Sequence, residues 1–217
     1  MHLLDYTEQM KKALIDKLNK KAAVIGVVGL GYVGLPLALS YSEAGYCVIG
    51  LDTDAQKKTL IEKGKTYIKH INGERISAAT RNGFSVSTNF DDAQQCDALI
   101  ICVPTPLNKH REPDLSFVTS TMTNLRPFFR AGQIVSLEST TYPGTTEEVL
   151  RPYLESDDLV VGENIFLIYS PEREDPGNEQ FQAENIPKIC GGTTSNCLEV
   201  GQALYGQVIN VVVPVSD

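Results

Sequence analysis

Two short segments of this sequence carry side chains suited to acid–base chemistry and to holding a ligand. Glu138–Thr146 reads ESTTYPGTT, and its hydroxyl groups can donate hydrogen bonds or orient a water molecule. Ser170–Gly177 contains Glu172, which can exchange protons if burial raises its pKa, beside Arg173, which can bind a phosphate or carboxylate through two hydrogen bonds. Taken alone, both segments also fit ordinary turns or a solvated run of charges. Their position after segments that we expect to be strands favours a functional role.

A glycine-rich turn earlier in the chain has the spacing of a dinucleotide-binding unit. A continuous apolar run over residues 24–28 leads into GLGYVG over residues 29–34. Gly29 allows a tight turn, Gly31 lets a diphosphate approach the backbone, and Gly34 lets the following helix pack closely. The free N–H groups at the start of that helix would bind the anion.

An acidic residue, Asp52, ends the second expected strand of this unit. Its carboxylate can accept hydrogen bonds from an adenosine ribose, whereas a 2′-phosphate would meet a like charge there. The alternative is a Rossmann-like domain that has lost its ligand. Because strand, turn, helix, second strand and acid occur in that order, the sequence predicts NAD binding in preference to NADP binding.

Strand-like and helix-like segments alternate along the rest of the chain. We expect strands at residues 84–87, 98–103, 134–137, 166–169 and 208–213, and helices at residues 55–63 and 73–82. This alternation predicts an α/β fold with a doubly wound parallel sheet, a Rossmann-like dinucleotide-binding domain. Ligands bind at the carboxyl ends of strands in such sheets, where the two polar segments would meet a third loop, CVPTP at residues 102–106.

Residues 3–20 predict an N-terminal helical extension to this domain. Apolar side chains recur near helical spacing at Leu3, Tyr6, Met10, Leu14 and Leu18. We expect this stripe to pack on the domain or on a partner subunit; a membrane-surface helix is a lesser alternative because aromatic anchors are few. No linker divides the remainder, so we expect a helix over residues 1–22 and one domain over residues 23–217.

Composition excludes several classes of partner. Of the 217 residues, 42% are hydrophobic and 21% are charged, as in an ordinary globular domain, and no apolar run approaches a membrane span. The net charge of −8 argues against a nucleic-acid surface and against anionic membranes, so a small molecule is the expected ligand. The five cysteines include no CxxC pair, and no signal-peptide pattern is present. We therefore expect reduced thiols in a cytoplasmic protein, without disulfides or a metal site.

Together these motifs resemble the UDP-glucose/GDP-mannose dehydrogenase family, the nucleotide-sugar 6-dehydrogenases. GLGYVGLPLA, the Asp52 and Asp54 pair with Lys57, the VPTP loop, the hydroxyl-rich loop and the SPER turn occur in the family's order from about Ala23 onward. SPEREDPGN and the YIKHI segment at residues 67–71 are most similar to the UDP-N-acetylglucosamine 6-dehydrogenase branch. In the UDP-glucose branch an aromatic residue usually stands where this chain has Arg173.

The resemblance implies a double oxidation at C6 of a UDP-sugar, from alcohol to carboxylate, with two NAD⁺. It assigns Glu172 as the acid/base group and implies that Glu172 and Arg173 contact the substrate. A threonine of the hydroxyl-rich loop would position a catalytic water; Thr140 and Thr141 are both candidates because this loop is one residue longer before its proline than the family pattern. The implied cofactor-binding residues are Gly29, Gly31, Tyr32, Val33, Gly34, Asp52, Lys57, Pro104, Thr105 and Ser139.

The family's thioester-forming cysteine and its oxyanion-stabilising lysine and asparagine have no counterpart in this sequence. We therefore expect the N-terminal, NAD-binding portion of a longer cytoplasmic enzyme. Alone it would bind NAD(H) without turning over nucleotide sugar. It would form a homo-oligomer through the portion that follows, and acidic amino sugars would serve as surface-polysaccharide precursors.

Other interpretations remain open from the sequence. UDP-glucose and UDP-N-acetylmannosamine are alternative substrates within the same class. A free-standing NAD(H)-binding sensor or assembly module is a second class of function. A simpler Rossmann dehydrogenase, with a single oxidation, is a third, although it explains neither the SPER turn nor the hydroxyl-rich loop.

Overall fold

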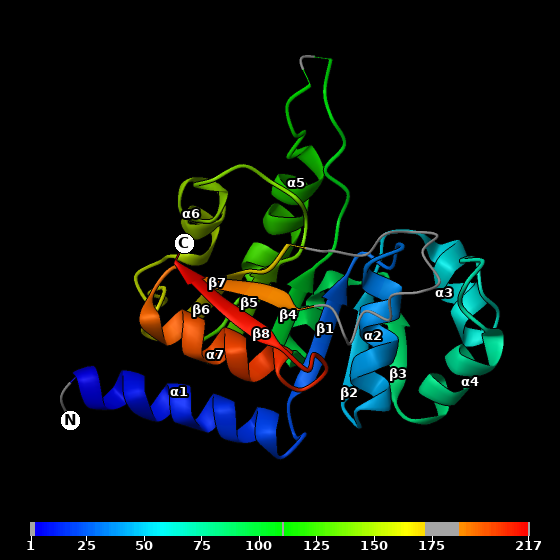
Figure 1. Cartoon of the computed structure of the whole chain (residues 1–217), viewed down its shortest axis with the longest axis horizontal. Coiled ribbons are helices and arrows are strands. Elements are labelled where there is room, and N and C mark those ends of the chain that lie inside the picture. The colour runs from blue at the N-terminus through cyan, green and yellow to red at the C-terminus, as the bar shows by residue number, and fades with distance from the viewer. Residues whose placement is uncertain (1–2, 110, 172–186, 217) are drawn as a thin grey trace.

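The computed structural model describes residues 3–109, 111–171 and 187–216. Within these ranges the strands form one sheet in the order β3-β2-β1-β4-β5-β6-β7-β8 (Figure 1). The strands are β1 (Val24–Val28), β2 (Cys47–Leu51), β3 (Phe84–Ser87), β4 (Ala98–Ile101), β5 (Gln133–Leu137), β6 (Ile165–Tyr169), β7 (Lys188–Gly192) and β8 (Val212–Ser216).

The strands from β3 to β6 are parallel and end level with one another. Their last residues pair in succession across the sheet, in the order Ser87, Leu51, Val28, Ile101, Leu137 and Tyr169. Every residue of β4 and β5 is buried, as expected of parallel strands that are covered on both faces. The predicted α/β fold with a doubly wound sheet is therefore confirmed, and the segments that follow these strands begin at one edge.

The far edge of the sheet differs from the expected arrangement. β7 was not among the expected strands and runs antiparallel to β6, while β8 is parallel to β7. The apolar run expected as a strand over residues 208–213 begins pairing only at Val212. The N–H groups of Val208 and Ile209 instead donate to the carbonyl of Tyr205 at the end of the preceding helix. Because of these local hydrogen bonds at the helix end, the strand begins later in the chain than expected.

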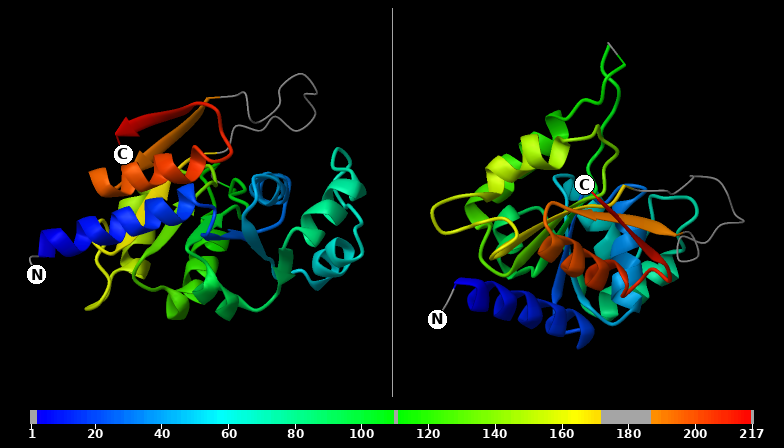
Figure 2. Two further views of the ribbon diagram at one scale, coloured as in Figure 1. Left: turned by 90° about the horizontal axis from the view of Figure 1, so that it is seen from below. Right: turned by 60° about the vertical axis from the view of Figure 1, so that its left-hand side comes forward.

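Helices cover both faces of the sheet (Figures 1 and 2). The helices are α1 (Leu3–Asn19), α2 (Gly34–Glu43), α3 (Ala55–Glu62), α4 (Gly73–Arg81), α5 (Ser116–Leu125), α6 (Arg151–Leu154) and α7 (Ser195–Tyr205). Shorter turns are the 3₁₀ helices η1 (Phe90–Gln95) and η2 (Arg126–Phe128) and the π-helical turn η3 (Thr146–Leu150). Tyr41 of α2 donates its hydroxyl to the carbonyl of Leu204 in α7 at 3.1 Å, which joins these two helices on one face. No helix among the described residues is both long and apolar enough to cross a bilayer.

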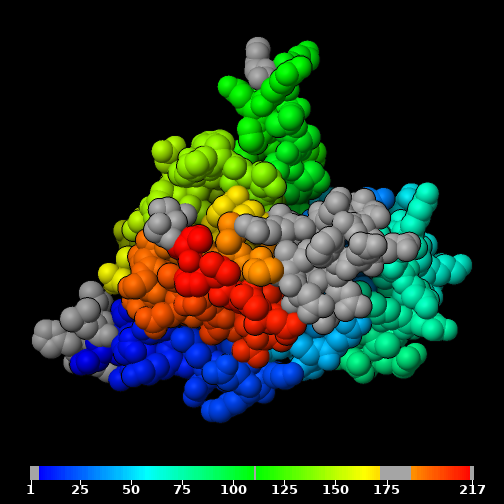
Figure 3. Space-filling view, in the orientation of Figure 1, coloured from blue at the N-terminus to red at the C-terminus, as the bar shows by residue number. Residues whose placement is uncertain are grey.

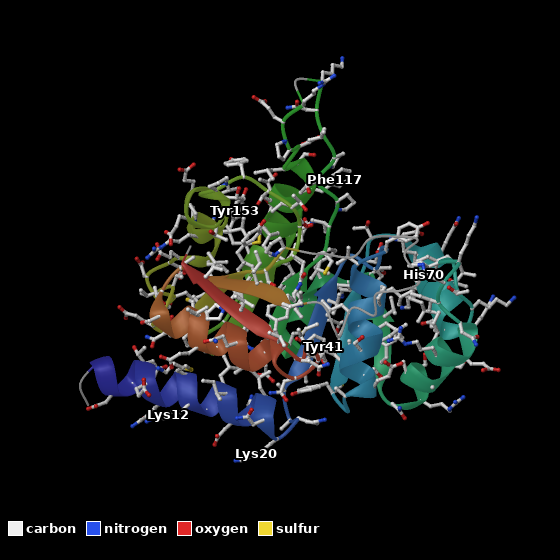
Figure 4. All side chains as sticks on the ribbon, in the orientation of Figure 1. Lys12, Lys20, Tyr41, His70, Phe117 and Tyr153 are labelled. Atoms are coloured by element: carbon white, nitrogen blue, oxygen red, sulfur yellow. The ribbon has the colours of Figure 1, made fainter. Side chains whose placement is uncertain are left out.

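The N-terminal helix α1 packs against α7 (Figure 3). Leu14 and Leu18 are buried, as the sequence predicts, whereas Tyr6 is 38% exposed. Lys11 is also buried, and its ammonium lies 2.6 Å from Glu199 and 3.1 Å from Asn196, both on α7. Lys12 and Lys20 project away from the domain (Figure 4). Of the two expected arrangements, this chain shows packing on its own domain.

A second anchor of α1 is Asp97, at the amino end of β4. Its carboxylate accepts hydrogen bonds from Lys17 at 2.9 Å, Arg130 at 3.2 Å and the N–H of Val24 at 3.1 Å. Burial alone would raise the pKa of Asp97, but these three donors hold it below its ordinary value. The contribution of Asp97 to stability is therefore present above the ordinary aspartate pKa of about 3.9 and is lost as the pH falls further.

Replacing Leu18 with alanine tests whether α1 is part of the folded domain. Leu18 is fully buried, and its backbone carbonyl, which accepts from Tyr46 at 2.6 Å, is unchanged by the substitution. We expect L18A to lower the free energy of unfolding by about 2–5 kcal/mol in urea denaturation. The exposed Lys12→Ala on the same helix should change it by less than about 0.5 kcal/mol. Equal stability of the two variants would show that α1 does not dock as described.

Candidate cofactor-binding site

A cavity of about 760 Å³ opens at the carboxyl ends of the parallel strands. Two predicted residues, Gly34 and Thr141, do not line it, and Glu172 and Arg173 lie outside the described residues. The other predicted residues all line the cavity: Gly29, Gly31, Tyr32, Val33, Asp52, Lys57, Pro104, Thr105, Ser139 and Thr140. The aligned strand ends thus bring together segments that are far apart in the chain.

The geometry of the glycine-rich turn agrees with the role that the sequence suggests for each of its three glycines. Gly29 has a φ of +90°, and a Cβ there would lie 2.9 Å from the carbonyl oxygen of Cys102. A Cβ on Gly34 would lie 1.8 Å from the carbonyl oxygen of Gly29, so only glycine lets α2 begin so close to the turn. A Cβ on Gly31 would meet nothing within 4 Å. Gly31 therefore leaves open space where a diphosphate would approach the backbone.

Asp52 is buried at the end of β2 and accepts hydrogen bonds from three directions. Its Oδ2 accepts from the N–H of Leu30 and from the ammonium of Lys57, both at 2.7 Å, and its Oδ1 accepts from the N–H of Asp54 at 2.9 Å. Asp52 is 7% exposed and lines the cavity. A carboxylate oxygen has two lone pairs, so Oδ1 keeps acceptor capacity for a ribose hydroxyl.

The loops after β4 and β5 are tied to each other by hydroxyl groups. Thr105 donates to the carbonyl oxygen of Thr140 at 2.7 Å, and Ser139 donates to the carbonyl oxygen of Val103 at 2.5 Å. These two hydrogen bonds hold the loops together. Because they use the hydroxyl protons of Thr105 and Ser139, the hydroxyl oxygens of both residues can still accept hydrogen bonds from a ligand. The side chain of Thr140 is exposed and lines the cavity.

One wall of the cavity is formed by residues that the sequence analysis did not single out. Phe90 of η1 lines the cavity, as do Phe117, Ser120, Thr121 and Asn124 of α5. Phe117 lies near the base of the projecting segment that precedes α5 (Figure 4). Spacing along α5 does place Phe117, Ser120, Thr121 and Asn124 on one helical face, but only the fold shows that this face meets the cavity.

A buried ion pair lies at the β5 side of the cavity, and sequence reasoning missed it. Glu138, fully buried at the end of β5, lies 2.7 Å from the ammonium of Lys188 on β7, itself 7% exposed. That ammonium also lies 5.1 Å from the ring centre of Tyr205, whose hydroxyl is 2.6 Å from that of Ser136. Burial raises the pKa of Tyr205 well above its ordinary value, and the nearby carboxylate of Glu138 raises it further, so the phenol stays neutral.

These features fit a dinucleotide. The open backbone at Gly31 suits a diphosphate, Asp52 suits a ribose, and the cavity extends from the β2 end to the β5 end as a two-part ligand requires. Within residues 3–109, 111–171 and 187–216, no three histidine, cysteine or acidic side chains gather as metal ligands.

Comparison with known proteins also identifies a dinucleotide-binding domain. Residues 23–209 match the model of the UDP-glucose/GDP-mannose dehydrogenase family, NAD binding domain. The chain is 34% identical over 186 residues to the UDP-N-acetyl-D-glucosamine 6-dehydrogenase of Pseudomonas aeruginosa. This match covers 85% of this chain and 43% of the relative. It is 32% identical over 216 residues to a UDP-N-acetyl-D-mannosamine dehydrogenase of Methanococcus aeolicus, covering 96% of this chain and 46% of the relative.

A solved structure shows the same similarity in three dimensions. The UDP-N-acetyl-mannosamine dehydrogenase Cap5O of Staphylococcus aureus superposes with a TM-score of 0.82 at 30% identity, covering 89% of this chain and 48% of that protein. The chain thus spans a little less than half the length of these relatives.

Replacing Asp52 with asparagine tests its predicted role in choosing the cofactor. Removing the negative charge removes repulsion of a 2′-phosphate. The ratio of the Kd for NADPH to the Kd for NADH, measured in binding titrations, should therefore fall about tenfold. Asp54→Asn is the matched control because asparagine also caps the start of α3, where Asp54 accepts from the N–H of Gln56 at 2.8 Å. Asp54 also lines the cavity, so an equal change in both variants would show that the discrimination depends on the summed negative charge there and not on Asp52 in particular.

The buried pair of Glu138 and Lys188 predicts that replacing one partner destabilises the protein strongly and that replacing both restores much of the stability. Lys188→Met would leave the buried carboxylate of Glu138 without this ammonium, and should cost about 3–5 kcal/mol in the free energy of unfolding. Adding Glu138→Gln to Lys188→Met removes the charge as well and should restore more than half of that loss. A double variant as unstable as the sum of the two single variants would contradict an interaction between these side chains.

Proposed function

The chain belongs to the UDP-glucose/GDP-mannose dehydrogenase family, whose NAD-binding domain it carries, and we propose that it serves an enzyme that oxidises C6 of a UDP-sugar to a carboxylate. The observation that supports this best is the family match over residues 23–209, which includes the glycine-rich turn, Asp52 and the loops that line the cavity. The chain spans less than half of its relatives, so the complete reaction is proposed for the protein of which this domain is part.

The proposed reaction removes two hydrides from C6. An alcohol, one water and two NAD⁺ would give a carboxylate, two NADH and three protons. When bound, each NAD⁺ supplies the chemistry of a hydride acceptor. We assign to Glu172 the proton transfers at the substrate, with Arg173 beside it as a substrate contact. Covalent capture of the intermediate aldehyde would need a nucleophile outside this chain.

Thr140 is the better candidate for positioning the water of the second oxidation. Its side chain is exposed and lines the cavity, whereas Thr141 is partly buried and does not line it. The hydrogen bond from Thr105 to the carbonyl oxygen of Thr140 would hold this residue in place beside the cofactor.

We propose UDP-N-acetylglucosamine as the substrate. The resemblance of SPEREDPGN and YIKHI to that branch supports it, as does the similarity to the Pseudomonas aeruginosa enzyme. UDP-N-acetylmannosamine is the second candidate because relatives with comparable identity carry that name. Either acetamido sugar would be consistent with synthesis of polysaccharide precursors in the cytoplasm.

The experiment that tests this proposal measures NADH formed per UDP-sugar consumed by the protein extended to the end of its reading frame. UDP-N-acetylglucosamine, UDP-N-acetylmannosamine and UDP-glucose are compared in parallel. We expect about two NADH per molecule of the first sugar. Thr140→Val should lower kcat at least about tenfold, and Thr141→Val should change it less than about twofold.

Three outcomes would contradict parts of the proposal. One NADH per sugar would rule out the double oxidation, and no NADH with any sugar would favour a binding module. A higher kcat/KM for UDP-N-acetylmannosamine would replace the proposed substrate with the second candidate.

A further inference from the structure

Leu30, inside the glycine-rich turn, is held at both ends of its backbone by side chains from other elements. Its N–H donates to Asp52 Oδ2 at 2.7 Å, and its carbonyl accepts from the hydroxyl of Tyr67 at 2.7 Å. Tyr67 comes from the connector over residues 64–72, between α3 and α4. The side chain of Leu30 is fully buried, and a Cβ on Gly50 would lie 2.8 Å from it. Leu30 therefore has little freedom to rotate.

These contacts fix the orientation of the two peptide groups that flank Leu30. In a trans peptide the carbonyl and the N–H point in opposite directions. The carbonyl of Leu30 points to Tyr67, so the N–H of Gly31 in the same peptide group points away from Tyr67. Gly31 lines the cavity, and a Cβ added to it would meet nothing within 4 Å. The hydrogen bond from Tyr67 thus determines where this N–H group is directed.

The connector contacts the turn at a second point. The ring of His70 lies 6.4 Å from the ring of Tyr32, at an interplanar angle of 31°. Figure 4 shows His70 beside α3, on the side of the molecule that holds β2. Burial raises the pKa of Tyr67, and Asp52 and Asp54 raise it further, so its hydroxyl keeps the proton that it donates. The connector is therefore held against the turn by two different contacts.

We propose that Tyr67 is a positioning residue for dinucleotide binding: its hydroxyl holds the peptide between Leu30 and Gly31 so that the N–H of Gly31 is available to a phosphate of the cofactor. Without this hydrogen bond the peptide could rotate in the free protein, and binding would have to restore its orientation. The proposal rests on the NAD-binding domain and does not depend on which sugar is oxidised.

The test compares Tyr67→Phe with Tyr46→Phe in the 217-residue chain. Both substitutions remove one tyrosine hydroxyl that donates to a backbone carbonyl, at 2.7 Å for Tyr67 and at 2.6 Å for Tyr46. Tyr46 donates to Leu18 and does not line the cavity, so Y46F reproduces the loss of a buried hydrogen bond away from the ligand. Titration calorimetry with NADH, ADP-ribose and adenosine gives the affinities, and thermal unfolding confirms that each variant is folded.

We expect Y67F to weaken the binding of NADH and ADP-ribose about threefold to tenfold, which corresponds to the net value of roughly one hydrogen bond. Binding of adenosine, which lacks the diphosphate, should change less than about twofold. Y46F should bind all three ligands as the unchanged chain does, even where its unfolding temperature falls further than that of Y67F. Wild-type affinity in Y67F, or an equal loss for adenosine, would overturn the proposal.

Discussion

The level ends of six parallel strands are the constraint on which the rest of this structure depends. A shift of one residue in a central strand would exchange the side chains that pack against the two helix layers, and the close-packed core resists that exchange, so packing holds the register. Because Leu51, Val28, Ile101 and Leu137 are successive partners, the chain leaves the sheet at one edge after each of these residues. The cavity at that edge is a consequence of the register.

Two buried carboxylates stand at this edge, and each is held by a lysine at the same distance. Asp52 follows β2 and lies 2.7 Å from Lys57, while Glu138 follows β5 and lies 2.7 Å from Lys188. A carboxylate removed from water needs a compensating charge and hydrogen bonds. Lys57 comes from the next helix of the same binding unit. Lys188 comes from β7, so the antiparallel strand at the far side of the sheet stabilises the β5 end of the cavity.

Most of the strand ends at the cavity and the glycine-rich turn were predictable from the sequence, although the strand expected over residues 98–103 already ends at Ile101. The predicted boundaries of β3 and of helices α3 and α4 agree with the structure within one residue, because short apolar runs and the capping residues Asp54 and Asn72 act locally. The family resemblance is also confirmed, since several motifs in one order carry far more information than any one of them. The catalytic roles of Glu172 and Arg173 stay predictions, because both residues lie outside the described ranges.

What the sequence determined by itself is therefore the set of local features: the turn that only glycine allows, the acid after the second strand and the family to which they belong. Only the tertiary structure decided that β7 runs antiparallel, that Lys188 meets Glu138 across 50 residues and that Tyr67 reaches the carbonyl of Leu30. The physical reason is the range of the interactions. Conformational preferences and caps act between near neighbours, whereas the partner of a buried charge or carbonyl is chosen by packing among distant segments.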